Sequence, residues 1–183
     1  MQNCTPTAYV FCLQTLVQLY LYGEGRTLQD SLAAACLFPN LEVLSLEPNH
    51  KRVTPGIREG RLDLAVLEPL PALERLQCSL CESVVLKGTT TLPHLRSLHL
   101  CSMDSVEIDA TLPRLQDLQV LHSGVLRLEG PHLQLPQLSQ LRLRNIKTPA
   151  VSWSALPQLT AVTAVGCQQL TTAALSELGR LNS

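Results

Sequence analysis

The sequence repeats one nine-residue phrase, Leu-Pro-x-Leu-x-x-Leu-x-Leu, along almost its whole length. Five copies keep the proline in the same slot, and they begin at Leu70, Leu92, Leu112, Leu135 and Leu156. A sixth copy begins Phe38-Pro39, and a seventh, 13–21, carries Gln14 in the proline slot. Successive copies are 25, 32, 22, 20, 23 and 21 residues apart. Self-similarity at such a period indicates an array of stacked structural repeats.

The second half of each phrase predicts a strand. Its Leu-x-Leu pair has the period of two that sends both side chains to one face of a strand. Strands stacked in parallel would join these leucines into a continuous core that no single repeat can bury. Between the copies lie short, β-branched apolar segments, 84–86, 106–108 and 125–128, which are typical of short strands or extended turns on the outer side.

Two segments have helical spacing instead. The segment 28–37 follows Thr27, which is a suitable N-cap, and the segment 171–181 would close the C-terminal end of the array. The one long interval, 47–62, contains prolines, glycines and several basic residues, and it predicts a surface insertion between the second and third repeats.

Composition limits the partners that this array can have. The chain has 183 residues, 45% of them hydrophobic, which is enough for one core and one domain spanning 1–183. A net charge of −1 and only 3% aromatic residues argue against nucleic acid and anionic membranes as partners. Seven cysteines without disulfide spacing favour a reduced compartment, cytoplasmic or nuclear. The apolar stretch 9–22 is interrupted by Gln14 and Gln18 and is predicted to be the first repeat rather than a membrane span or signal.

The phrase and the residues after it resemble leucine-rich repeat proteins. Leu41-x-x-Leu44-x-Leu46-x-x-Asn49 matches the signature Leu-x-x-Leu-x-Leu-x-x-Asn/Cys in full, and 73–81 matches it with Cys78 in a leucine slot. The resemblance implies an α/β solenoid: an arc of about seven repeats with a parallel concave sheet, short strands or turns on the convex side, and few helices. The Asn/Cys slot holds other residues in the remaining repeats (Glu24, Met103, Ser123 and Ile146), so we expect an irregular, flattened arc.

One repeat points to a narrower group. The segment 159–175, with Cys167 in the Asn/Cys slot, looks like the cysteine-containing repeats of F-box substrate receptors. That resemblance implies a substrate-recognition part of a ubiquitin ligase. The array starts near residue 13, so we expect no F-box within this sequence.

The candidate binding residues are those that alternate with the inward leucines. Solenoids use such a concave surface for extended contacts, and Tyr and Arg are common at interface hot spots. We expect a protein partner to be bound there, without catalysis, metal or cofactor. The expected contact residues are Tyr20, Tyr22, Ser45, Glu47, Arg75, Gln77, His99, Asp117, Gln119, Gln140, Arg142 and Arg144.

Two alternatives remain at this level. Cys78 and Cys81 form a CxxC motif, with His94, His99 and Cys101 downstream, which would suit a zinc or redox site. The repeat register instead places Cys78 at an inward leucine position and Cys81 at the Asn/Cys position, where both have a structural role. The second alternative is self-association, because the first repeat lacks a polar cap and would leave an apolar end exposed.

Overall fold

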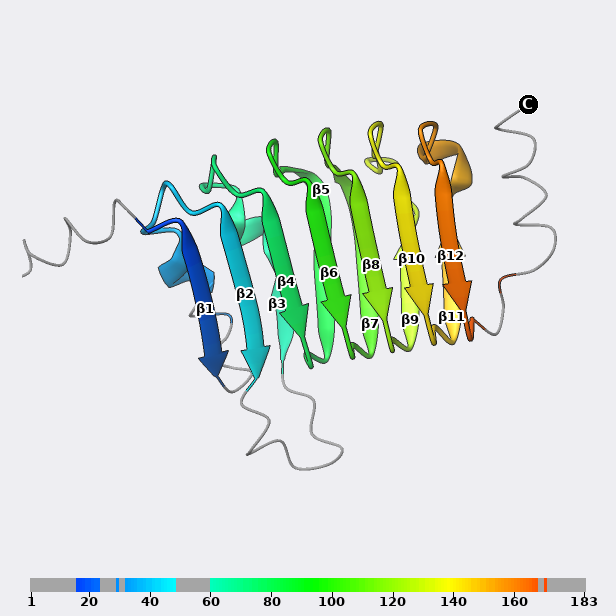
Figure 1. Ribbon diagram of the computed structural model, residues 1–183, viewed down its shortest axis with the longest axis horizontal. Coiled ribbons are helices and arrows are strands. Elements are labelled where there is room, and N and C mark those ends of the chain that lie inside the picture. Colours follow the sequence, from blue (N-terminus) through cyan, green and yellow to red (C-terminus); the bar gives the residue numbers. More distant parts are fainter. Residues whose placement is uncertain (1–15, 24–28, 30–31, 49–59, 168–169, 171–183) are drawn as a thin grey trace, which may run out of the picture.

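The chain coils into a solenoid with two parallel β-sheets on opposite sides. The computed structural model describes residues 16–23, 29, 32–48, 60–167 and 170, and Figure 1 shows the strands of the two sheets in two layers. Within these residues, the front sheet has seven strands in the order β1-β2-β4-β6-β8-β10-β12, and the back sheet has five in the order β11-β9-β7-β5-β3. This arrangement confirms the predicted solenoid.

Each copy of the repeated phrase ends in a strand of the front sheet. These strands are β1 (Gln18–Gly23), β2 (Val43–Pro48), β4 (Arg75–Ser79), β6 (Ser97–Cys101), β8 (Asp117–Leu121), β10 (Gln140–Arg144) and β12 (Ala161–Val165). The apolar segments between copies form the back sheet, as predicted. Its strands are β3 (Arg61–Asp63), β5 (Ser83–Thr91), β7 (Ser105–Thr111), β9 (Val125–Leu128) and β11 (Thr148–Val151).

The inward leucines stack into buried columns between the two sheets. Leu44, Leu76, Leu98, Leu118 and Leu141 are paired from strand to strand in one register. Each of them is at most 1% exposed. A neighbouring column two residues further on contains Leu46, Cys78, Leu100, Val120 and Leu143, all buried as well. The predicted continuous core is therefore confirmed.

The proline of each phrase belongs to a tight turn that leads into the strand. The amide of the fourth residue donates to the carbonyl of the first in every described copy, for example from Leu95 to Leu92 at 3.2 Å and from Leu138 to Leu135 at 3.2 Å. Proline suits the second position of such a turn because its φ is already fixed near the required value. Both leucines of the turn are buried, so the phrase encodes a turn and a strand together.

A left-handed corner follows five strands of the front sheet. Leu80, Ser102, His122 and Asn145 have φ between 53° and 60°, and Gly166 has φ of 67°. The amides of the four non-glycine corners donate to carbonyls of the adjacent repeat, at 2.7 to 2.9 Å. The residue after each corner occupies the Asn/Cys position of the leucine-rich repeat signature. Cys81, Met103, Ser123 and Ile146 are all buried at this position.

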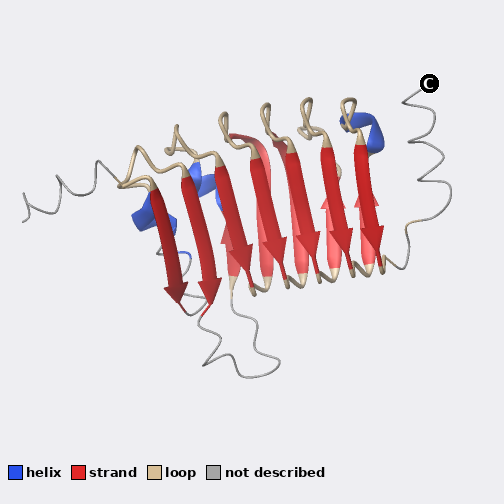
Figure 2. Ribbon diagram, viewed as in Figure 1, coloured by secondary structure: helices blue, strands red, loops and turns tan. Residues whose placement is uncertain are grey.

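Helical structure is limited in the described residues. Gln29 and residues 32–35 are helical, in agreement with part of the predicted helix 28–37, and Leu32 and Ala35 join the core. Two short 3-10 helices, η1 (Leu64–Leu67) and η2 (Trp153–Ala155), lie on the path between the sheets. Figure 2 shows how little of the described chain is helical, so this part is a β-solenoid rather than an α/β one.

Several boundaries differ from those predicted. The insertion 47–62 is shorter, because β2 extends to Pro48 and β3 begins at Arg61, and residues 49–59 lie outside the described part. The predicted C-terminal helix 171–181 also lies outside it. Among the described residues, no helix is both long and apolar enough to span a bilayer.

Candidate protein-interaction face

The outward side chains of the front sheet form three rows across the strands. We call this surface the seven-strand face. Its middle row runs Tyr20, Ser45, Gln77, His99, Gln119, Arg142 and Thr163. Arg75, Asp117 and Gln140 lie in the row that begins each strand, and Tyr22, Glu47 and Arg144 lie near the strand ends. The structure therefore places all twelve predicted residues on this one sheet.

Ser45 is less exposed than its neighbours in the middle row. Tyr20 is 56% exposed, and the long polar side chains Arg75, Gln77 and Arg142 are also exposed. Ser45 lies in the same row but is only 4% exposed, because its short side chain lies below its longer neighbours. It therefore offers a partner no protruding contact. Of Tyr22 only the backbone is described, in β1.

The centre of the face is organised by one carboxylate. Oδ2 of Asp117 accepts a hydrogen bond from Nε2 of Gln119 at 2.9 Å and lies 3.7 Å from Nη1 of Arg142. Arg142 also donates from Nη2 to Oε1 of Gln140 at 2.8 Å. Exposed ion pairs of this kind contribute at most about 1 kcal/mol to stability. Together these contacts link Asp117, Gln119, Gln140 and Arg142 into one cluster.

The same carboxylate has an unsatisfied oxygen. Oδ1 of Asp117 is inaccessible to solvent and has no hydrogen-bond partner in the described part of the chain. A buried polar atom without a partner costs free energy. The central cluster is therefore not optimised for folding alone.

Ser97, His99 and Asp117 bring the residue types of a nucleophilic triad together, which the sequence analysis did not anticipate. Oγ of Ser97 lies 3.0 Å from Nε2 of His99, and Oδ2 of Asp117 lies 3.4 Å from the same nitrogen. A triad needs the serine on one ring nitrogen and the carboxylate on the other. Because both contacts use Nε2, this cluster lacks the relay geometry.

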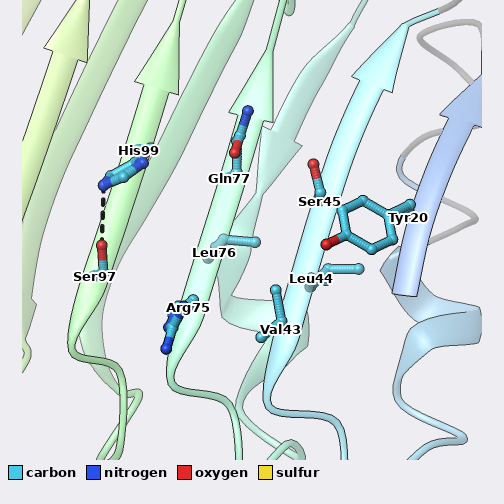
Figure 3. A pocket seen from close by; sticks show the side chains of 9 residues that line it. All are labelled: Tyr20, Val43, Leu44, Ser45, Arg75, Leu76, Gln77, Ser97 and His99. Carbon is cyan, nitrogen blue, oxygen red and sulfur yellow. Dashed lines mark hydrogen bonds between the residues drawn. The ribbon is translucent and has the colours of Figure 1, made fainter. Parts of the chain in front are cut away.

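A hollow lies beside this cluster, over strands β1, β2, β4 and β6. Its volume is about 240 Å³. Figure 3 shows the side chains around it, with the ring of Tyr20 beside Ser45 on one side and His99 on the other. The lining residues are Tyr20, Val43, Leu44, Ser45, Arg75, Leu76, Gln77, Ser97 and His99.

The cysteines of the CxxC motif lie in the core. Cys78 and Cys81 are both 0% exposed. Burial raises the pKa of the Cys81 thiol to about 12, and burial together with the nearby Cys81 raises the pKa of Cys78 well above its usual value. Metal binding and thiol redox chemistry both need the thiolate, which this environment disfavours. Within the described residues, no group of three or more His, Cys, Asp or Glu side chains could hold a metal ion.

Sequence reasoning found the residues of the face but missed their contacts. Aligning the repeats places His99, Gln119 and Arg142 in one row, so this row could be predicted from the sequence. The approach of Asp117 to His99 and Arg142 depends on side-chain rotamers across three strands, and the hollow depends on a small residue between larger ones. Neither follows from spacing along the chain.

Comparison with known proteins adds no family to this description: no protein-family model matches the chain, and neither does any curated protein or solved structure.

Proposed function

We propose that this chain is a non-catalytic leucine-rich repeat protein that binds another protein on the seven-strand face, its concave side. The repeated phrase carries the family assignment, since its turn, strand and inward leucines recur in the same structural places. The finer role in ubiquitin-ligase substrate recognition rests on the cysteine-containing repeat alone and stays a prediction.

One observation carries the binding proposal. The outward residues of seven strands lie in register, so polar and charged groups far apart in the sequence form one fixed surface. A parallel ladder fixes the backbone beneath them, and Asp117 restrains the side chains at the centre. A preordered surface loses little conformational entropy on binding.

The polar character of the face favours a protein partner over a small molecule. The hollow, at about 240 Å³, is below the roughly 300 Å³ at which small-molecule pockets begin. It has the size of an anchor site for one side chain, which is a common feature of protein interfaces. The Arg and Tyr residues around it are the types most often found at hot spots.

The test is a charge reversal with a matched control. Partners captured from native cells by the wild-type chain should be lost when Arg142 and Arg144 are both changed to Glu. Arg127→Glu is the control, because Arg127 is an exposed arginine of β9 in the other sheet, near Glu107 at 3.9 Å. Capture of the same partners by the double variant, or their loss with the control alone, would contradict the assignment.

A further inference from the structure

The hollow in the seven-strand face exists because one short residue lies between longer ones. Ser45 is paired in register with Tyr20 on one side and Gln77 on the other. Arg75 and His99 extend the wall on strands β4 and β6 (Figure 3). The floor therefore lies around Ser45 on β2, and the longer side chains around it, polar and apolar, form the walls. The depression is built into the register and needs no movement of the strands.

The charge at the hollow is positive and not compensated. Arg75 lies opposite Val43 and Ser97 in the sheet, and it forms no ion pair with any residue that the structure describes. Two carboxylates of the face, Glu47 and Asp117, have other partners. Glu47 accepts a hydrogen bond from Nε2 of Gln77 at 3.3 Å, and Asp117 accepts from Gln119. Neither carboxylate lines the hollow.

Two residues with hydroxyl groups, Ser45 and Tyr20, also line the hollow. Ser45 is 96% buried, yet its hydroxyl makes no hydrogen bond to another described residue, and the hydroxyl of Tyr20 makes none either. The Ser45 oxygen keeps some contact with solvent and Tyr20 is more than half exposed, so a ligand acceptor can replace water at both hydroxyls. Arg75 lines the same hollow as these two residues.

The donors that line the hollow suit a carboxylate. A guanidinium and a carboxylate form a bidentate pair that is stronger than neutral hydrogen bonds. Phosphate recognition typically uses clusters of arginines, whereas Arg75 is the single arginine that lines this hollow. The volume holds one side chain, and the ring of Tyr20 and the side chain of Val43 offer apolar surface for its methylene groups.

We propose that the hollow is the anchor site for an acidic side chain, aspartate or glutamate, of the partner protein. This inference rests on the proposed function and names the chemistry that the partner must present. The carboxylate pairs with Arg75 and accepts hydrogen bonds from Tyr20 and Ser45. The central cluster around Asp117 then contacts a neighbouring part of the same partner.

A phage-displayed library of random linear peptides, selected on the immobilised full chain, tests this inference. Peptides enriched on the wild type should share an acidic residue at one position. Arg75→Glu should reverse that preference to Lys or Arg at the same position. Arg75→Lys should keep it with about tenfold weaker binding of the selected peptide, because the bidentate geometry is lost. Ser45→Val should fill the floor and weaken the same peptide, with an unchanged melting temperature as proof of folding.

The outcomes separate this inference from the proposed function. An acid preference that persists in Arg75→Glu, or enriched peptides without a shared acid, overturns the anchor site. If the peptides enriched in either of these two cases no longer bind the Arg142→Glu, Arg144→Glu variant, the face binds its partner and only the proposal of the anchor site is wrong. If no peptide is enriched, or if none responds to any variant of the face, both proposals fail. Arg127→Glu serves again as the control that should bind like the wild type.

Discussion

At the scale of single residues, the left-handed corners are where this fold makes its strictest local demands. Four corners place ordinary L-residues at φ between 53° and 60°, in a region that costs them roughly 1–2 kcal/mol. Asn145 is better suited than Leu80 because asparagine tolerates this conformation. At the fifth corner, Gly166 meets a second constraint, since a Cβ there would overlap Oδ1 of Asn145.

Replacing Gly166 by alanine should therefore destabilise the protein by more than the backbone cost alone. Gly88 is the matched control: it has φ of 78°, and a Cβ there would meet nothing within 4 Å. We expect Gly88→Ala to cost about 1 kcal/mol in urea unfolding, and Gly166→Ala somewhat more because the Asn145 side chain must move aside. Adding Asn145→Ala to Gly166→Ala should recover the difference. Equal losses for the two single variants would show that the overlap is relieved at no cost.

The buried thiol of Cys81 predicts a pH dependence of stability. Its pKa rises from 9.0 in the unfolded chain to about 12 in the folded one, because burial disfavours the thiolate. Its contribution is complete below about pH 9 and is lost as the pH rises toward 12, since only the unfolded chain ionises readily there. Urea unfolding between pH 7 and pH 10, compared with Cys81→Ala, should show a steeper alkaline loss for the wild type. Parallel pH profiles would contradict the prediction.

At the scale of elements, the strand pattern could be predicted because it is local. The alternation in β8 places Leu118 and Val120 in the core and Asp117, Gln119 and Leu121 outward, with the burial that the period of two requires. The strands of the back sheet could also be predicted, because they are short β-branched segments. The bounds of the insertion were not, because Glu47 and Arg61 are drawn into strands by pairing with neighbours, which local sequence does not specify.

Strand β8 supplies its own test of the two faces. Leu118→Ala should cost about 2–5 kcal/mol, because it removes a fully buried side chain and leaves a cavity. Leu121→Ala, in the same strand but on the outward side, should cost much less, since Leu121 is only partly buried. Free energies of unfolding in urea measure both. A loss at Leu121 as large as that at Leu118 would mean that the outward side is part of the core.

At the scale of the whole molecule, stacking converts a sequence repeat into a surface. Arg75, His99, Asp117 and Arg142 lie in four different repeats, and the sheet register brings their strands side by side. The location of the face could therefore be predicted from the period. The contacts within it could not, because they depend on which rotamers meet across strands and on the depth left above Ser45.

Hydroxyl-radical footprinting of the chain, free and bound to its captured partner, tests the central claim that the partner covers the seven-strand face. Tyr20, His99 and Leu121 on that face should lose reactivity in the complex, whereas exposed His132, which lies between β9 and β10 and outside that face, should keep it. Protection of His132 with unchanged reactivity at Tyr20 and His99 would place the partner elsewhere and contradict the account.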